Sequence, residues 1–319
     1  MRISINEQAM GIVREIMDQK DDLQCAVLEQ ENGATLIDAG IAVNGGVEAG
    51  RLSAEVCLGG LGAVRLTNTH IGDLTLPSVV VGTDQPKIAL MGSQYAGWAI
   101  RVDSYSALCS GPARALAGVE NGLFTELDYR DDSSVGVICL ETREPPPEKV
   151  TQFISDSCGI SASDLYCIMA PTASIAGSVL MSARIAEVGV RSLHRLGFGP
   201  AKIRTGHGTA PIPPLAKDDR EAMGVTNDCI LYGGRAFLFV KSEEGDNLPS
   251  LIEKASSCAS PQYGQPLYTL LKSGGFDINR LDSSLFGPAE ITVNDITTGL
   301  TLKGGYVNPK ILRQSLEMK

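Results

Sequence analysis

The chain has 319 residues, a formal net charge of −10 and a sequence pI near 4.9. Hydrophobic residues make up 43% and charged residues 20% of it, a balance that excludes wholesale disorder and fibrous repeats. The acidic charge excludes a general attraction to nucleic-acid phosphates or anionic membranes, and it favours a cationic small substrate. No run of about 18 apolar residues occurs, so no membrane span is predicted, and MRISINEQAMGIVREIMDQK indicates a surface helix instead of a signal peptide.

Cysteines and histidines set the expectations for compartment and metals. The eight cysteines show no C-x-x-C spacing and lie mostly in apolar, strand-like runs, so we expect buried, reduced thiols and a cytoplasmic protein. The three histidines lie neither four residues apart nor beside a cysteine. This spacing matches no zinc or iron motif, and we expect no metal site.

The first third of the chain predicts short strands and helices. CAVLEQENGATLIDAG predicts two strands joined at Asn32-Gly33, a dipeptide typical of tight hairpins. In EAGRLSAEVCLGGLGAVRLTN helical and strand-like signals alternate. Its LGGLG stretch, residues 58 to 62, fits neither the dinucleotide fingerprint nor the Walker loop, which favours packing or a bulge over phosphate binding. SVVVG and KIALMG are predicted strands.

A polar stretch, GSQYAGW, follows the second of these strands. It contains Ser93, Gln94, Tyr95 and the only tryptophan, Trp98. Such a segment at a strand end is typical of a ligand-contacting loop, and an ordinary turn is the alternative.

CSGPARALAG, residues 109 to 118, predicts a capped helix. Ser110 or Gly111 can cap it, Pro112 suits its first position, and Gly118 can end it. Free amides at such a start, together with Arg114, attract a phosphate or carboxylate. A purely structural helix is the alternative.

The middle of the chain contains the predicted domain boundary. VGVICLE predicts a strand, and TREPPPEKVTQFISDSCG predicts a stiff connection and an amphipathic helix ending near Gly159. The length favours two domains, which we place at 1–144 and 145–319 while leaving a discontinuous division open. LYCIMAPTASIAGSV then predicts a strand, a turn with Thr172 or Ser174 as cap, and a helix from 174 to about His194.

Downstream, the elements favour mixed sheets. We expect a glycine- and proline-rich loop (RTGHGTAPIPPLAKDD), a short helix (EAMGVTND), a strand pair (CILYGGRAFLFVKS), helices within 247–273, a hairpin (EITVNDITTGLTLKG) turning at Thr298-Gly299, and a final helix. Strands occur both in hairpins and beside helices. This favours an α+β fold over a doubly wound parallel architecture.

One pair of charges stands out in the helix predicted from 174. Arg184, Glu187 and Arg191 lie at i, i+3 and i+7, with the carboxylate between two guanidinium groups. A solvent-facing ion ladder is one explanation. The many alanines and glycines around the pair favour a central helix instead, where a charged pair is costly unless it is useful. Desolvation raises the pKa of a sheltered carboxylate, and a neighbouring arginine lowers it. The balance of the two effects can produce a base that takes a proton from water.

The chain resembles the methenyltetrahydromethanopterin cyclohydrolase family. The matching segments are ENGATLIDAG, EAGRLSAEVCLGGLG, MGSQYAGW, CSGPARALA, APTASIAGSV with SARIAEV, AMGVTND with ILYGGR, and LFGPAE. They are spread from residue 31 to 290 and cover nearly the whole chain. Tyr95, LGGLG, ILYGGR and LFGPAE look more like the form found in bacteria that oxidise one-carbon compounds. Tyr95 and Gly208-Thr209 depart from many archaeal members, which bears on how the acidic tail of the pterin is held.

The resemblance implies a cytoplasmic, cofactor-independent homotrimer of α+β fold with an interdomain cleft for the reduced pterin. Such an enzyme interconverts the methenyl pterin plus water with the 5-formyl pterin, in one-carbon metabolism such as formaldehyde oxidation or a pathway related to methanogenesis. The catalytic arginine and glutamate of the family correspond to Arg184 and Glu187 in R-x-x-E. A non-catalytic pterin-binding protein is the alternative. A nicotinamide-dependent dehydrogenase ranks last, because no G-x-G-x-x-G follows a strand.

Further substrate contacts are expected in the matched segments. Phe286 offers a flat apolar face for the pterin ring, or it belongs to the core. Asn227 is a candidate pocket residue, whereas its neighbour Asp228 is as well explained as a structural cap. The other candidates for substrate binding are Ser93, Gln94, Tyr95, Ser110, Gly111, Arg114, Thr172 and Ser174.

Overall fold

The computed structural model describes residues 3–317 and contains two mixed six-stranded sheets with helices, which confirms the predicted α+β class. The chain divides into two compact units. Unit 1 is Met1–Ala63 with Lys87–Leu180, and unit 2 is Val64–Pro86 with Met181–Lys319. This division is discontinuous, unlike a single cut at 144/145, and the Pro145–Pro147 run joins two elements of unit 1. The expected interdomain cleft stays a prediction.

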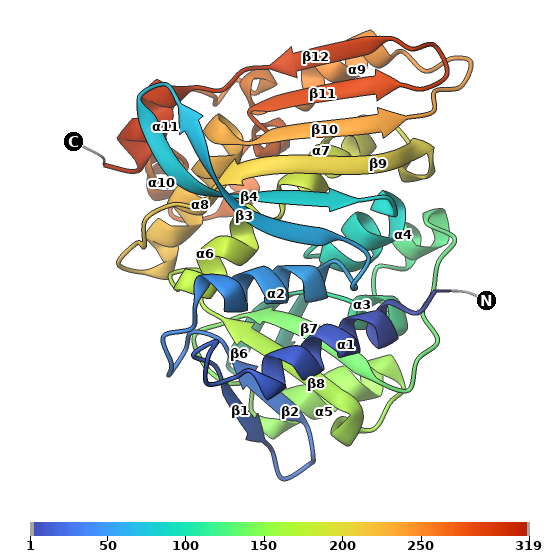
Figure 1. The fold of residues 1–319 in the computed structure, drawn as a ribbon, viewed down its shortest axis with the longest axis vertical. Coiled ribbons are helices and arrows are strands. Elements are labelled where there is room, and N and C mark those ends of the chain that lie inside the picture. Colours follow the sequence, from blue (N-terminus) through green and yellow to red (C-terminus); the bar gives the residue numbers. More distant parts are fainter. Residues whose placement is uncertain (1–2, 318–319) are drawn as a thin grey trace. The chain divides into compact units, whose positions relative to one another are not determined.

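Unit 1 is built on a sheet with the strand order β1-β2-β8-β7-β6-β5, in which β2, β8 and β7 run parallel (Figure 1). Its elements are α1 (Ile5–Asp18), β1 (Ala26–Glu29), β2 (Thr35–Asp38), α2 (Val47–Cys57), the π-helix η1 (Lys87–Gln94), β5 (Trp98–Val102), β6 (Tyr105–Ser110), α3 (Ala113–Ala117), α4 (Asn121–Glu126), β7 (Gly136–Glu141), α5 (Glu148–Cys158), η2 (Ala162–Asp164), β8 (Leu165–Ala170) and most of α6 (Ile175–Ser182).

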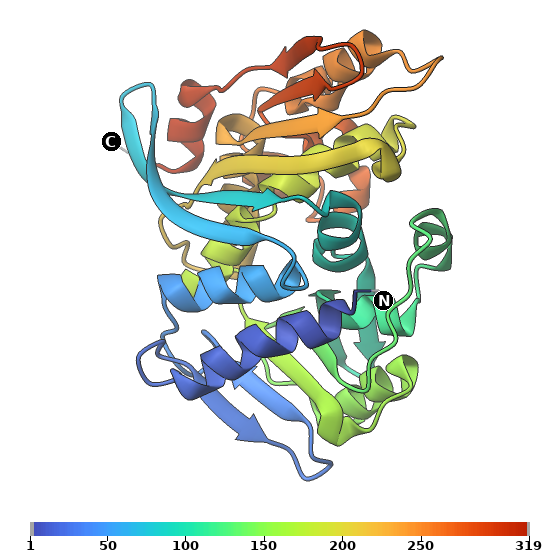
Figure 2. The same cartoon turned by 45° about the vertical axis from the view of Figure 1, so that its right-hand side comes forward.

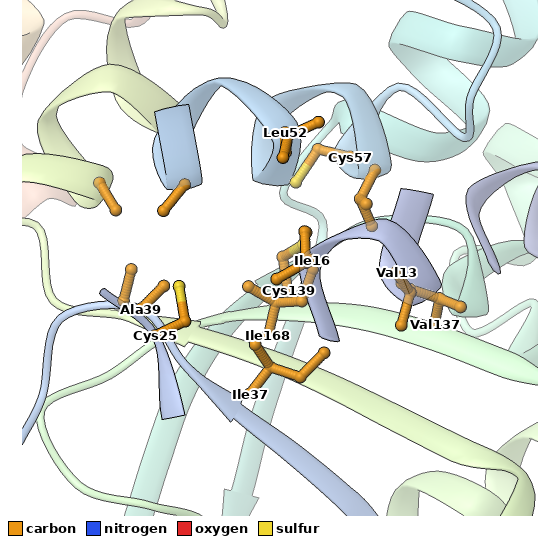
Figure 3. Close-up of a cluster of buried hydrophobic side chains, with 14 of the residues drawn as sticks. Val13, Ile16, Cys25, Ile37, Ala39, Leu52, Cys57, Val137, Cys139 and Ile168 are labelled. Atoms are coloured by element: carbon orange, nitrogen blue, oxygen red, sulfur yellow. The ribbon is translucent and has the colours of Figure 1, made fainter. Parts of the chain in front are cut away.

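Both faces of this sheet are buried at its central strand β7. Figure 3 shows side chains of α1 and α2, such as Ile16 and Leu52, pointing toward Val137 and Cys139 of β7. The alternate β7 residues, Ile138 and Leu140, belong to the second apolar cluster, which includes residues of α5. A strand covered on both faces has no polar side, which explains why VGVICLE is a continuous apolar run.

Unit 2 has the strand order β12-β11-β10-β9-β4-β3, with β10 and β11 parallel. Its elements are β3 (Ala63–Ile71), β4 (Leu74–Thr83), α7 (Ile185–Arg195), η3 (Pro200–Lys202), β9 (Ile203–Pro211), α8 (Asp219–Gly233), β10 (Arg235–Val240), α9 (Leu248–Ala255), η4 (Ser257–Ala259), α10 (Leu267–Ser273), η5 (Ile278–Arg280), η6 (Ser283–Phe286), β11 (Glu290–Asp295), β12 (Thr301–Gly305) and α11 (Pro309–Ser315). In Figures 1 and 2, α7 and α9 lie on one face of this sheet.

Both predicted hairpins are confirmed. β1 and β2 pair antiparallel around Gly33, and β11 and β12 pair antiparallel around Gly299, with φ of 88° and 75° at the two glycines. A positive φ is strained for residues with a Cβ, which is why glycine occupies both positions. The LGGLG stretch ends α2, and its Gly59 lies against Ile5 of α1, as the packing alternative predicted.

The prediction of a strand at KIALMG is wrong. These residues form the π-helix η1, which closes with the Tyr95 N–H donating to the Leu90 carbonyl at 2.8 Å. A short apolar run fits a buried helix as well as a buried strand, and periodicity cannot separate the two. Ser93 and Gln94 therefore end a helix and do not follow a strand.

The long helix expected from 174 to 194 is divided into α6 and α7. At the break, the Arg184 N–H donates to the Met181 carbonyl three residues back, and the Ser182 hydroxyl donates to the Pro211 carbonyl at 2.9 Å. Arg184 thereby becomes the N-cap residue of α7, and Glu187 lies in the first turn of a new helix.

Two predictions of secondary structure in unit 2 are wrong. RTGHGTAP is the strand β9 and not a loop, and CILYGG belongs to the helix α8 and not to a strand. A Cβ on Gly208 would lie 2.7 Å from the Ile185 side chain, so glycine in this strand serves the close approach of α7. Local composition indicates a loop here because it contains no information about the helix packed above.

We predict that Gly189→Ala destabilises the protein although alanine favours helices. A Cβ at Gly189, within α7, would lie 2.6 Å from Ala236 Cβ on β10, so overpacking should lower the free energy of unfolding by about 1–3 kcal/mol. The matched control is Gly11→Ala in α1, where a Cβ meets no described atom within 4 Å and should stabilise by up to about 1 kcal/mol. Urea unfolding of both variants measures the difference, and an equal shift would contradict the close packing of α7.

Candidate active site

The first turns of α7 gather three charged side chains of unit 2. Glu187 is fully buried, whereas the side chains of Arg184 and Arg191 are 16% and 33% exposed. These values exclude the solvent-facing ladder and confirm that the carboxylate lies between two guanidinium groups. Position in the first helical turn also favours the negative charge, because the helix N-terminus carries partial positive charge.

The two oxygens of Glu187 are held differently. Oε2 accepts hydrogen bonds from Arg184 Nη2 at 3.0 Å and from Arg184 Nε at 3.3 Å. Arg191 Nε lies 3.0 Å from Oε1, but neither atom has a hydrogen-bond partner among the described residues. The contact to Arg191 is therefore an ion pair without a hydrogen bond, and Oε1 keeps its capacity to accept one.

This geometry suits general base chemistry. A carboxylate fixed through one oxygen presents the other in a constant direction to a donor such as water. Arg184 cannot act as the base itself, since a guanidinium does not deprotonate near neutral pH. Of the R-x-x-E pair, only Glu187 can therefore accept a proton.

Phe286 joins the same group of residues. It ends η6, is half-buried at the edge of an apolar cluster, and its carbonyl accepts from Arg191 Nη2 at 3.3 Å. Asn227 lies on α8 and donates through Nδ2 to the Met223 carbonyl of its own helix at 2.8 Å. Of the candidates in unit 2, the structure brings Arg184 and Glu187 together, and the backbone carbonyl of Phe286 contacts their neighbour Arg191.

A second group of candidates meets in unit 1. The Ser93 carbonyl at the end of η1 accepts from the Gly111 N–H at 2.9 Å and from Arg114 Nη1 at 3.0 Å. The Arg114 guanidinium lies 5.3 Å from the centre of the Tyr95 ring. Ser93 Oγ is buried and has no hydrogen-bond partner within residues 3–317. Gln94 is buried beside it, and Ser110 precedes Gly111 at the end of β6.

Arg114 already binds a carboxylate of the protein. Its side chain is fully buried and donates to both carboxyl oxygens of Glu120 as well as to carbonyls of η1. α3 begins at Ala113, after Pro112 as its N-cap residue, and Gly111 has a φ of 106°. Sequence reasoning missed Glu120, because no local spacing relates it to Arg114.

The turn after β8 carries the remaining two candidates. Ser174 Oγ accepts from the Gly177 N–H at 3.0 Å, so Ser174 is the cap of α6. Thr172 is buried, and its hydroxyl donates to Glu141 at the end of the neighbouring strand β7. The adjacent ends of two parallel strands bring Thr172 and Glu141 together, and the sequence reading missed Glu141.

Asp228 is a structural cap. It is fully buried, accepts from the Leu267 N–H at the start of α10 and from the Ser315 hydroxyl at 2.6 Å, and does not depend on a ligand for its partners. Burial outweighs these hydrogen bonds and raises the pKa of Asp228 to about 7. The folded protein therefore keeps a proton that the unfolded chain releases near pH 4.

We predict that Asp228 makes stability fall as pH rises from about 4 to about 7. In this window the unfolded chain binds fewer protons than the folded one, so the free energy of unfolding decreases by at most about 1.4 kcal/mol per pH unit and levels off above. Asp228→Asn is neutral throughout and should remove this slope. Urea unfolding at several pH values checks it, and parallel profiles for the two proteins would refute the assignment.

Within residues 3–317, no group of three or more His, Cys, Asp or Glu side chains is arranged to hold a metal ion. All eight cysteines are free, and seven of them are buried. Among the same residues, no helix has both the length and the apolar character needed to cross a membrane.

Known proteins resemble this chain over its whole length. A family model described as "Cyclohydrolase (MCH)" matches residues 4–316. A methenyltetrahydromethanopterin cyclohydrolase of Methanococcus vannielii is 40% identical over 318 residues, covering 99% of this chain and 98% of that protein. The enzyme of the same name from Methanocaldococcus jannaschii is 40% identical with 98% of each chain covered, and that of Methanothermobacter marburgensis is 41% identical with 98% and 99% covered.

Proposed function

The chain belongs to the cyclohydrolase (MCH) family, and from this premise we propose that it is a methenyltetrahydromethanopterin cyclohydrolase. The reaction interconverts 5,10-methenyltetrahydromethanopterin plus water with 5-formyltetrahydromethanopterin. The observation that carries the proposal is the buried carboxylate of Glu187, held by Arg184 through one oxygen. A pterin-binding protein without activity is not favoured, since the relatives are named as enzymes and the R-x-x-E pair is intact.

The substrate supplies its own electrophile. Its methenyl bridge is part of an amidinium cation, so the bridging carbon is open to attack by water without further activation. The proposed chemistry therefore needs no metal or other cofactor.

Glu187 moves the proton in this scheme. Oε1 accepts a proton as water adds to the carbon, which forms a tetrahedral carbinolamine. The same carboxyl group returns that proton to nitrogen 10 as the bond between carbon and nitrogen 10 breaks. The carbinol hydroxyl loses its own proton to solvent as its oxygen becomes the carbonyl, so the formyl group remains on nitrogen 5 and one proton is released overall. One residue serves both directions of the reversible reaction, while Arg184 keeps its carboxylate in place.

The pterin contacts are proposals with different support. Phe286 has a half-buried aromatic ring, which suits stacking on the substrate. Ser93 has a buried hydroxyl without a partner among the described residues, which suits a hydrogen bond to the ring edge or tail. For the remaining candidates the support is their position in matched segments: Gln94, Tyr95, Ser110, Gly111, Arg114, Thr172, Ser174 and Asn227.

Location, assembly and pathway follow the family resemblance. Eight free cysteines suit a reducing compartment, and we place the enzyme in the cytoplasm. A homotrimer and a role in formaldehyde oxidation belong to the same proposal. Gel filtration with light scattering measures the subunit number directly.

We predict that Glu187→Gln lowers kcat by roughly 10²–10⁴-fold, the usual worth of a positioned acid or base. The amide keeps the size of the side chain but accepts no proton at neutral pH, so pterin binding should change little. Loss of methenyl absorbance measures turnover, and equilibrium binding of the substrate provides the control. Wild-type turnover in this variant would show that Glu187 does not act as the acid or base of the reaction.

The substrate assignment has its own test. We expect the purified enzyme to hydrolyse methenyl-tetrahydromethanopterin faster than methenyl-tetrahydrofolate under identical conditions, because binding energy from the longer pterin tail contributes to the rate. Both reactions are followed by the loss of methenyl absorbance. Activity with the folate compound alone would overturn the assignment.

A further inference from the structure

A second arginine contacts the catalytic carboxylate from the next turn of α7. Arg191 Nε lies 3.0 Å from Glu187 Oε1, whereas the bonds from Arg184 go to the other oxygen, Oε2. Its Nη2 donates to the Phe286 carbonyl at 3.3 Å. These contacts connect Arg191 both to Glu187 and to the end of η6.

The unusual feature of this contact is the missing hydrogen bond. Arg191 Nε and Glu187 Oε1 are both buried, and neither has a hydrogen-bond partner among residues 3–317 although they form an ion pair. Unsatisfied buried polar atoms are rare and costly, so such a pair calls for an explanation. A guanidinium that attracts Oε1 without bonding to it stabilises the carboxylate and leaves the lone pairs of that oxygen for another donor.

We propose that Arg191 is a positioning residue for the hydration step, a role that rests on the proposed function. Its charge holds Oε1 in place from one side, and its bond to the Phe286 carbonyl fixes the direction from which it acts. Arg184 restrains Oε2, so two arginines together set the orientation of the carboxylate. Oε1 accepts no hydrogen bond from the described residues and keeps its lone pairs for the attacking water. Arg191 does not touch the reacting carbon in this role.

The charges around this pair favour the same interpretation. α7 contributes Arg184, Arg191 and Arg195, and the N-cap of η6 contributes Asp282, whose charge acts on Arg195. Arg195 Nη1 lies 3.4 Å from the Ser283 hydroxyl of η6, so it also connects α7 to this short helix. Like Arg191, Arg195 therefore connects α7 to η6, but it does not share the contact to Glu187. It provides a matched control.

We expect Arg191→Gln to lower kcat by roughly 10- to 100-fold, the cost of a misplaced catalytic group, with KM little changed. Arg191→Lys keeps a positive charge near Oε1 and should recover part of the lost turnover. Arg195→Gln should keep the kcat of the wild type. Steady-state kinetics of the three variants with methenyl-tetrahydromethanopterin measures these effects, and far-UV circular dichroism checks their folding.

A double-mutant cycle separates positioning from general structural support. If Arg191 acts through Glu187, then Arg191→Gln should cost no further kcat in a Glu187→Gln enzyme, because the group it positions is already inactive. The same cycle with Arg191→Lys serves if the glutamine variant does not fold. An equal loss in both backgrounds, or wild-type kcat in Arg191→Gln, would overturn the proposal.

The two proposals can fail separately. If the wild-type enzyme had no activity on the methenyl pterin, the proposed function would be wrong. An active wild-type enzyme whose Arg191 and Arg195 variants behave alike would remove the role of Arg191 alone.

Discussion

A fully buried carboxylate paired with two arginines is the constraint on which the site of this protein depends. Taking an ion out of water costs several kcal/mol, and only well-placed opposite charges and hydrogen bonds offset this cost. Glu187 has both, from Arg184 with two hydrogen bonds and from Arg191 with an ion pair. The arginines are the less buried members of the group, so their own desolvation is smaller.

α7 packs closely on its sheet. Gly189 on the helix and Gly208 on β9 have no room for a Cβ, which shows how near the two backbones lie. The break between α6 and α7 favours a negative charge on Glu187, because it places this residue in the first turn of a helix, where the N-terminus carries partial positive charge. In a continuous helix the same R-x-x-E spacing would exist without that favourable end. The catalytic proposal therefore rests on backbone geometry as much as on the two side chains.

The cluster around Arg114 in unit 1 shows how structural and binding roles can share one segment. Arg114 is satisfied by Glu120 and the η1 carbonyls, which fixes the end of a π-helix, an element common at functional sites. Among residues 3–317, the hydroxyl of Ser93 has no partner there. The segment therefore combines a rigid frame around Arg114 with a buried hydroxyl that has hydrogen-bonding capacity left.

Short-range patterns in the chain were sufficient for several features. The Asn32-Gly33 and Thr298-Gly299 hairpins, the Ser174 cap and the i, i+3 spacing of Arg184 and Glu187 each depend on residues a few positions apart, and the matched segments indicated the family. Neighbouring residues limit φ, capping and side-chain reach directly, so such features can be predicted without knowledge of the fold.

Features that depend on distant partners could not be predicted in this way. KIALMG forms a π-helix, RTGHGTAP lies in a strand and CILYG is helical, in each case against the local sequence signals. The complete burial of Arg114 and of Glu187 is likewise a product of packing. Burial and desolvation are set by contacts between segments far apart in the chain, and local propensity is too weak to oppose them.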